Sequence, residues 1–177
     1  LKQLLLMLQT KLTTKVKVAL LKQVSNSITQ EVFDSILIQC QLEDVAPLLG
    51  ENLFNDIISN PNNYSDLLSG GAYTYNNITY QNYGLEAVLA YYWYARYTMF
   101  GDVTDTPFGL MQKVSGEGTQ ATSQKIKDAL YQYNRNSAFT IWKSVENYLI
   151  RTNNELFNNV SLCQMKQKRN FNIQKIV

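Results

Sequence analysis

The second half of the chain contains a long stretch with helical spacing and neither glycine nor proline. From Gln124 onward, apolar and small side chains recur at intervals of three and four residues, the spacing of one side of an α-helix. The positions are Ile126, Leu130, Tyr133, Ser137, Ile141, Val145 and Tyr148. This predicts a helix of about 28 residues and about 40 Å. A chain organised around such a helix is expected to be a mainly α-helical bundle.

Three shorter helices are predicted between residues 27 and 70. Ser27 and Gln30 have the spacing of a capping box at the start of the first, which runs to about Asp44. Pro47 begins the second, and the third covers residues 64–68 before a Gly-Gly pair. The expected buried faces are Ile28, Val32, Ile36 and Cys40 in the first helix and Leu49, Leu53 and Ile57 in the second.

A small β-hairpin is predicted near residues 72–81. Aromatic and β-branched residues flank Asn76-Asn77, and asparagine tolerates the positive φ angles of a tight turn. Gly84 then begins a helix of about 17 residues that ends at Gly101. The apolar surface of this helix is wider than one packing face requires, so we expect it to be central in the bundle or to contact another subunit.

Two further segments are predicted to need a partner. Residues 102–123 are rich in glycine, threonine, serine and aspartate, and they form a loop longer than a compact domain usually carries. We expect something outside the monomer to order this loop. Near the C-terminus, Phe171 and Ile173 alternate with polar residues, as in a single strand. Such a strand pairs with the hairpin of its own chain or adds to a sheet on another protein.

Charge divides the chain into three parts. Five lysines and no acid precede Glu31, and four basic residues and no acid follow Glu155. The chain has a net charge of +2, so its middle carries −7. We predict a basic N-terminal arm or helix at residues 1–26, a helical body at 27–160 and a basic C-terminal arm at 161–177. In the first arm, a spacing of four predicts an amphipathic helix through Leu4, Leu8, Leu12, Val16, Leu20 and Val24.

The composition argues against most enzyme chemistry. The sequence has no histidine, which removes the usual general base, the Ser-His and Cys-His pairs and the His-containing zinc sites. Cys40 and Cys163 are too few for a disulfide framework or a thiolate metal site. Glu43 and Asp44 are adjacent and point about 100° apart on a helix, so we interpret them as a solvated helix end. We predict no enzyme, no cofactor and no metal.

No membrane segment is predicted either. The apolar run at residues 4–8 is far shorter than the roughly 20 residues of a membrane span. It also lacks a small-residue cleavage site, which argues against a signal peptide. We therefore expect a soluble protein in a reducing compartment.

Tyrosine is unusually concentrated in the middle of the chain. Nine of the twelve tyrosines lie between residues 64 and 97. Tyrosine has a large apolar face and a polar end, which suits protein interfaces and also stacking on single-stranded bases. Because Arg96 is the only basic residue in this segment, protein contact is favoured over nucleic acid. Packing in the protein's own core is the alternative.

Several of these segments occur in a recognisable order. They are residues 64–71, the hairpin, Gly84 to Arg96, Asp105 to Gly109 with Lys113, and Ala138 to Trp142 with Tyr148-Leu149. Their order and spacing resemble head–tail connector (ring or adaptor) proteins of tailed bacteriophages, and above all the ring proteins of crAss-like phages. The resemblance covers residues 28 to 160.

The resemblance implies a virion structural protein of the neck or tail region, assembled in the host cytoplasm. It implies a homo-oligomeric ring of twelve copies that contacts the portal protein and other ring or tail proteins. DNA would pass through its channel without sequence-specific binding, and an acidic lumen would not hold phosphates. The expected subunit-interface residues are Tyr73, Tyr75, Tyr80, Tyr91, Tyr94, Arg96, Asp105, Phe108, Lys113, Phe171 and Ile173.

The alternative function is a helical nucleic-acid-binding protein that uses its basic terminal arms. This alternative predicts an affinity for DNA that falls steeply with salt and disappears when both arms are removed.

Overall fold

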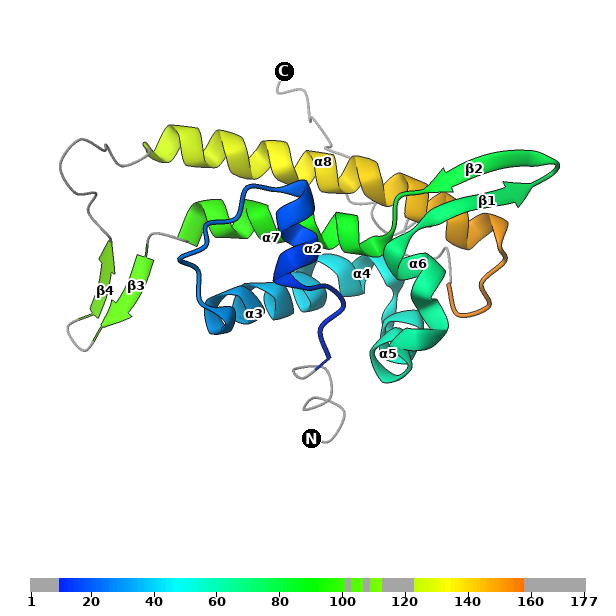
Figure 1. Ribbon diagram of the computed structural model, residues 1–177, viewed down its shortest axis with the longest axis horizontal. Coiled ribbons are helices and arrows are strands. Elements are labelled where there is room, and N and C mark those ends of the chain that lie inside the picture. Colours follow the sequence, from blue (N-terminus) through cyan, green and yellow to red (C-terminus); the bar gives the residue numbers. More distant parts are fainter. Residues whose placement is uncertain (1–9, 101–102, 107–108, 113–122, 158–177) are drawn as a thin grey trace, which may run out of the picture.

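The computed structural model describes residues 10–100, 103–106, 109–112 and 123–157. This part of the chain is mainly α-helical, as predicted. Helix α8 (Gln124–Arg151) extends along most of the length of the molecule, and α7 (Leu85–Phe100) packs against it (Figure 1). The predicted length of α8 is confirmed. The predicted C-terminal arm lies outside the described residues.

The other side of α7 is covered by the helices of the first half of the chain (Figure 1). Helix α3 continues directly into η1, one turn of π-helix, and then into α4. Helix α2 crosses α7, while α5, η2 and α6 form the end of the molecule next to the first hairpin. The bounds are α2 (Lys15–Leu21), α3 (Gln30–Gln39), η1 (Cys40–Val45), α4 (Ala46–Leu49), α5 (Glu51–Ser59), η2 (Pro61–Tyr64) and α6 (Ser65–Ser69).

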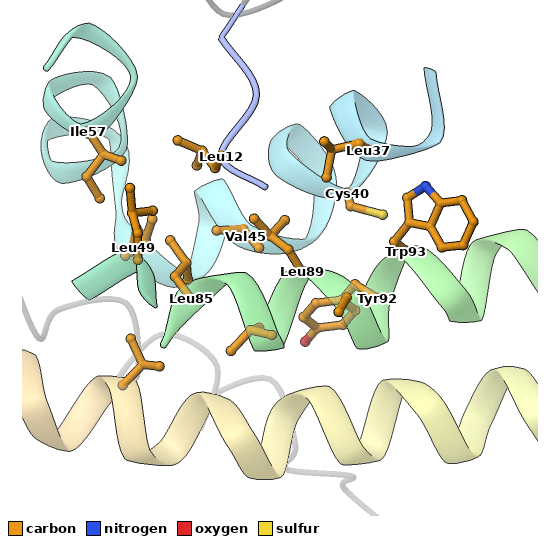
Figure 2. Packing of buried hydrophobic residues seen from close by; sticks show 14 of the residues in the cluster. Leu12, Leu37, Cys40, Val45, Leu49, Ile57, Leu85, Leu89, Tyr92 and Trp93 are labelled. Atoms are coloured by element: carbon orange, nitrogen blue, oxygen red, sulfur yellow. The ribbon is translucent and has the colours of Figure 1, made fainter. Parts of the chain in front are cut away.

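Helix α7 is the centre of the core, as its wide apolar surface predicted. Leu85 and Leu89 point toward Leu49 of α4 and Val45 of η1, and Trp93 lies beside Cys40 (Figure 2). The Trp93 indole N–H donates a hydrogen bond to the carbonyl of Phe33 at 3.0 Å. The fully buried Trp93 side chain therefore leaves no polar group unpaired, as a tryptophan in a core requires.

The start and the buried face of α3 differ from the prediction. Thr29, not Ser27, caps the helix, and its hydroxyl accepts a hydrogen bond from the Val32 amide. The Ser27 hydroxyl instead pairs with Ser25. The buried face is Phe33, Ile36, Leu37 and Cys40, and Val32 is exposed. Ser27 and Thr29 are both possible caps, and the capping-box spacing favoured Ser27, which does not cap the helix.

Glycines divide the next helices. The helix predicted from Pro47 to Asn60 is two helices, because Gly50 at φ +81° separates α4 from α5. The predicted face of Leu49, Leu53 and Ile57 is buried nonetheless, and Asn60 caps the end of α5. Helix α6 ends at Gly70, at φ +77°, as predicted.

Two antiparallel hairpins are present in the described residues. Strands β1 (Gly71–Tyr75) and β2 (Ile78–Asn82) pair Tyr73 with Tyr80 and Tyr75 with Ile78. Asn76 and Asn77 have φ of 49° and 61°, which confirms the predicted turn.

The second hairpin lies in the segment predicted as a loop. Strands β3 (Val103–Thr106) and β4 (Gly109–Gln112) pair there, so the prediction of a loop is wrong for these residues. Val103, Thr104 and Thr106 are β-branched and favour extended backbone, a local signal that the overall composition concealed. The rest of this segment and the strand predicted around Phe171 lie outside the described residues.

The described part of the N-terminal arm, residues 10–26, lies on the body of the same chain. Leu12 and Val18 are buried, whereas Val16 and Leu20 are exposed, so the predicted spacing-of-four face is wrong for α2. Four lysines of the arm contact other parts of the same chain. Lys11 pairs with Asp34, Lys15 donates to the carbonyl of Ile28, Lys17 pairs with Glu86 and Lys22 donates to Asn134.

Candidate assembly interface

Three of the tyrosines predicted as interface residues lie on one face of the first hairpin. Cross-strand pairs share a face of a hairpin, so Tyr73, Tyr75, Ile78 and Tyr80 point to one side, and Thr74 and Thr79 to the other. We call the first set the aromatic face. It turns toward the C-terminal end of α8.

Arg151, in the last turn of α8, holds the base of this face. Its guanidinium donates a hydrogen bond to the Tyr73 hydroxyl at 3.0 Å and lies 3.8 Å from the centre of the Tyr80 ring. Tyr148, one turn earlier, meets the Tyr73 ring edge-on, with centroids 5.0 Å apart. Cation–π and edge-to-face contacts of this kind are each worth about 0.5–1.5 kcal/mol. Burial raises the pKa of Tyr148, so its hydroxyl stays neutral.

The root of the hairpin is fixed by close backbone packing. A Cβ atom on Gly70 would lie 2.5 Å from the carbonyl oxygen of Asn82, and one on Gly84 would lie 2.6 Å from that of Leu68. The buried Asn82 side chain donates to the carbonyl of Asp66 at 2.9 Å and accepts from the Gly84 amide at 3.0 Å. The end of α6 and the start of α7 are thereby clasped together, and the hairpin leaves the body at a fixed position.

The tip of the hairpin has different surroundings. It projects past the end of α8 (Figure 1), and Tyr75 and Ile78 are both exposed there, on the aromatic face. Tyr73 and Tyr80, nearer the root, are half-buried. The hairpin is thus a fixed arm with an apolar end, which suits contact with another protein.

The predicted apolar stripe of α8 is exposed at its start. Ile126, Leu130 and Tyr133 are 53%, 39% and 65% exposed. The prediction of the helix is right, but that of its buried face is wrong in the N-terminal half. The buried residues are Lys127, Asn134, Ala138, Trp142, Val145, Glu146 and Leu149. Small and polar side chains such as Ala138 and Asn134 let α7 pack closely there, and hydrophobicity alone does not reveal that contact.

Tyr91 and Tyr94 contact the N-terminal arm of the same chain. The Lys22 ammonium lies 3.5 Å from the centre of the Tyr91 ring and 5.4 Å from that of Tyr94. It also donates to the Asn134 side-chain oxygen at 2.7 Å. Burial lowers the pKa of Lys22, while the two rings and the oxygen favour its charged form. These two tyrosines therefore bind the arm rather than forming an open surface.

Arg96, also predicted at an interface, lies in an ion network around the buried Asp44. Its Nε donates to Asp44 Oδ2 at 2.8 Å, its Nη2 pairs with Glu43 at 2.7 Å, and Arg135 Nη1 donates to Asp44 Oδ1 at 2.7 Å. The Asp44 side chain is 2% exposed, so interpreting it as part of a solvated helix end is wrong. Burial alone would lower the pKa of Arg96, but hydrogen bonds and the charge of Asp44 raise it.

The remaining predicted interface residues are less fully described. Asp105 lies in β3, and Phe108, Lys113, Phe171 and Ile173 lie outside the described residues.

Among described residues, no group of three or more cysteine, aspartate or glutamate side chains is placed to hold a metal ion. Within the same ranges, no helix has both the length and the hydrophobicity of a membrane span.

Two contributors to the aromatic face were missed in the sequence. Arg151 stands at the end of a helix with no local pattern that marks it, and only the fold brings it to the tyrosines. The position of Ile78 on the aromatic face could have been predicted from the sequence. A two-residue Asn-Asn turn fixes the register, so Ile78 must pair with Tyr75 and share its face.

Comparison with known proteins places the chain in a family. Residues 45–167 match the sequence profile described as "Family of unknown function (DUF6712)". The matched region contains the first hairpin, α7 and α8. No curated protein and no solved structure matches the chain.

Proposed function

The chain belongs to the DUF6712 family, whose function is unknown, and we propose that it is a virion structural protein. In this proposal it forms a ring between the portal and the tail of a tailed phage, extends the DNA channel and provides a docking surface for tail components. Residues 28 to 160, whose motifs resemble connector proteins, include the hairpin and both long helices.

The observation that carries the proposal is the projecting hairpin. Its root is held by the glycine contacts at Gly70 and Gly84, and its base is held by Arg151. The Arg151 guanidinium also lies 5.8 Å from the centre of the Tyr75 ring, yet Tyr75 and Ile78 remain exposed at the tip. A rigidly held arm with an apolar end loses little conformational entropy on binding, which favours contact between subunits.

The body is also built to keep its shape. Asp44 joins η1 to Arg96 of α7 and to Arg135 of α8, which links three segments far apart in the sequence. A subunit of a closed ring must hold its two contact surfaces at a fixed angle, since the rotation between copies decides whether the ring closes. The network supports this requirement.

The contacts of the N-terminal arm disfavour the alternative of nucleic-acid binding. Lys11, Lys15, Lys17 and Lys22 each contact an oxygen atom of the same chain. Each of these contacts would have to break before the lysine bound a phosphate. Binding through this arm would therefore compete with its contacts to the body.

The test is the assembly state of the full chain. We expect light scattering to show a concentration-dependent oligomer and negative-stain images to show closed rings with an open channel. Monomers at all concentrations up to about 100 μM would overturn the proposal. Tight DNA binding that weakens with salt and is lost when both arms are removed would favour the nucleic-acid alternative instead.

A further inference from the structure

The side of α8 that faces the hairpin is one continuous stripe. Residues at a spacing of three and four share a side of a helix, and this side runs along the whole of α8. Its members are Ile126, Leu130, Tyr133, Ser137, Ile141, Ser144, Tyr148 and Arg151. We call this set the α8 stripe.

The base and root of the hairpin contact the last three members of the α8 stripe, Ser144, Tyr148 and Arg151. Arg151 and Tyr148 contact the tyrosines of the aromatic face. One turn before Tyr148, the Ser144 hydroxyl accepts a hydrogen bond from the amide of Tyr83, just after β2. Every member from Ser137 to Arg151 is partly buried.

The N-terminal half of the α8 stripe is exposed, and its side chains are of the same kinds as those at the hairpin tip. The stripe presents two aliphatic residues and a tyrosine, namely Ile126, Leu130 and Tyr133. The hairpin tip presents an aliphatic residue and a tyrosine, Ile78 and Tyr75. The chain's own hairpin does not reach these three stripe residues. Its base is fixed at Arg151, about 30 Å along the helix from Leu130. The two apolar surfaces lie at opposite ends of the molecule (Figure 1).

We propose that the hairpin tip of one copy packs on the N-terminal half of the α8 stripe of the next copy. The occupant is a second copy of this chain, because the same side of α8 already binds the base of the hairpin at its C-terminal end within one subunit. The contact joins two different surfaces, so it is heterologous and repeats from copy to copy until a ring closes. The inference rests on the proposed function and names the surfaces that meet.

The first test is cross-linking between copies. Ile78→Cys and Leu130→Cys are combined in the full chain with Cys163→Ser, while the buried Cys40, whose thiol pKa is raised by burial, stays unreactive. A short bismaleimide cannot join positions 78 and 130 within one chain. We expect a ladder of dimers, trimers and larger species on a denaturing gel.

The control moves the second cysteine to the other side of the same helix. Phe139 is 44% exposed and lies away from the α8 stripe, and Leu130 on the stripe is 39% exposed. The pair Ile78→Cys with Phe139→Cys should therefore give no ladder. Equal ladders from both pairs would overturn the proposal, because they would show random collision.

The second test uses charge in place of cross-linking. Leu130→Asp puts a carboxylate into the proposed contact and should raise the dissociation constant of the oligomer at least about tenfold. Phe139→Asp should leave the dissociation constant unchanged. Far-UV circular dichroism should match the wild type in both variants.

The outcomes separate this inference from the proposed function. Rings in the images without a 78–130 ladder would overturn the inference and leave the proposed ring protein standing. Monomers throughout would overturn both. If the Leu130→Cys thiol of the monomer were protected from a monofunctional maleimide, another part of the same chain would cover the stripe, and the inference would fall.

Discussion

Asp44 and Arg96 face each other inside the helical body, with Asp44 Oδ2 2.8 Å from Arg96 Nε. The aspartate comes from the π-helical turn η1 and the arginine from the C-terminal half of α7. Arg135 of α8 completes the arrangement on the other carboxylate oxygen. The charge of one buried aspartate therefore stabilises two arginines on the two helices that form the centre of the fold.

Replacing Asp44 should destabilise the protein strongly. Asp44→Asn keeps the shape but leaves Arg96 and Arg135 without their shared negative charge, and breaking a buried ion pair costs about 3–5 kcal/mol. Glu43→Gln is the matched control, because Glu43 also pairs with Arg96 but is 60% exposed, and exposed pairs contribute about 0–1 kcal/mol. Urea unfolding measures both. Similar losses in the two variants would contradict this account.

The glycine contacts at the hairpin root should be intolerant of any side chain. Gly84→Ala introduces a Cβ 2.6 Å from the Leu68 carbonyl oxygen and also strains a backbone at φ +82°. Gly50→Ala is the control, since Gly50 has nearly the same φ, +81°, and open space around the added atom. Backbone strain of this kind costs about 1–3 kcal/mol. We expect Gly84→Ala to lose clearly more unfolding free energy than Gly50→Ala, and equal losses would show that the close contact does not matter.

Local signals in the sequence predicted the elements well. The absence of glycine and proline between residues 124 and 151 was enough for α8, and Asn76-Asn77 was enough for the first hairpin. The helical segment and the Asn-Asn turn are each determined by the backbone preferences of adjacent residues, so neither prediction depends on a distant contact. The three hairpin tyrosines of the candidate interface followed from the same local pattern.

Features that depend on a distant partner were not predictable in the same way. The buried face of α8 is set by how closely α7 packs on Ala138 and Asn134. The sequence predicts a solvated Asp44 because its arginines lie 52 and 91 residues away in the chain. Arg96 is the one basic residue among the tyrosines, but its ion pair with the buried Asp44 holds it against η1.

Loss of Arg151 should loosen the hairpin without unfolding the body. Arg151→Gln removes the charge over Tyr80 and the hydrogen bond to Tyr73, which together stabilise the base of the aromatic face. Faster hydrogen exchange is expected at the backbone amides of β1 and β2, by about tenfold, with little change in the core of α7. Thr140→Gln, at an exposed position of α8 away from the hairpin, is the control. Unchanged exchange in the hairpin would show that the glycine contacts alone fix it.

Stability should fall in alkali partly through Tyr64. Burial, together with a hydrogen bond to Asp56 and its charge, raises the pKa of Tyr64 to about 12. An unfolded tyrosine ionises near pH 10, so between pH 10 and 12 the unfolded chain loses this proton while the folded chain keeps it. Tyr64 therefore stabilises the fold fully below pH 10 and progressively less up to pH 12.

The variant Tyr64→Phe isolates this contribution, because all other tyrosines are common to both proteins. Urea unfolding at pH 9, 10, 11 and 12 should show the wild type more stable at pH 9, by about 1 kcal/mol. That difference should shrink toward pH 12. Parallel curves over the whole range would mean that Tyr64 titrates as an ordinary surface tyrosine.

The N-terminal arm should open when one buried side chain is changed. Gln41, in η1, accepts a hydrogen bond from the Leu12 amide at 2.8 Å and donates one to the Thr10 carbonyl at 3.0 Å. Gln41→Leu fills the space but leaves the buried Leu12 amide unpaired, which costs about 1–3 kcal/mol. Because the arm is held by few other buried groups, this cost should appear as local opening and speed trypsin cleavage after Lys11 and Lys15.

Mass spectrometry of a timed digest measures the cleavage, and the exposed neighbour provides the control. Gln39→Leu makes the same chemical change two residues earlier, at an exposed position at the end of α3. We expect cleavage of the arm to be at least about tenfold faster in Gln41→Leu than in Gln39→Leu, which should match the wild type. Equal rates in the three proteins would mean that the lysine contacts hold the arm by themselves. In that case the cleavage rate should rise with salt, because ion pairs such as Lys17 with Glu86 are screened.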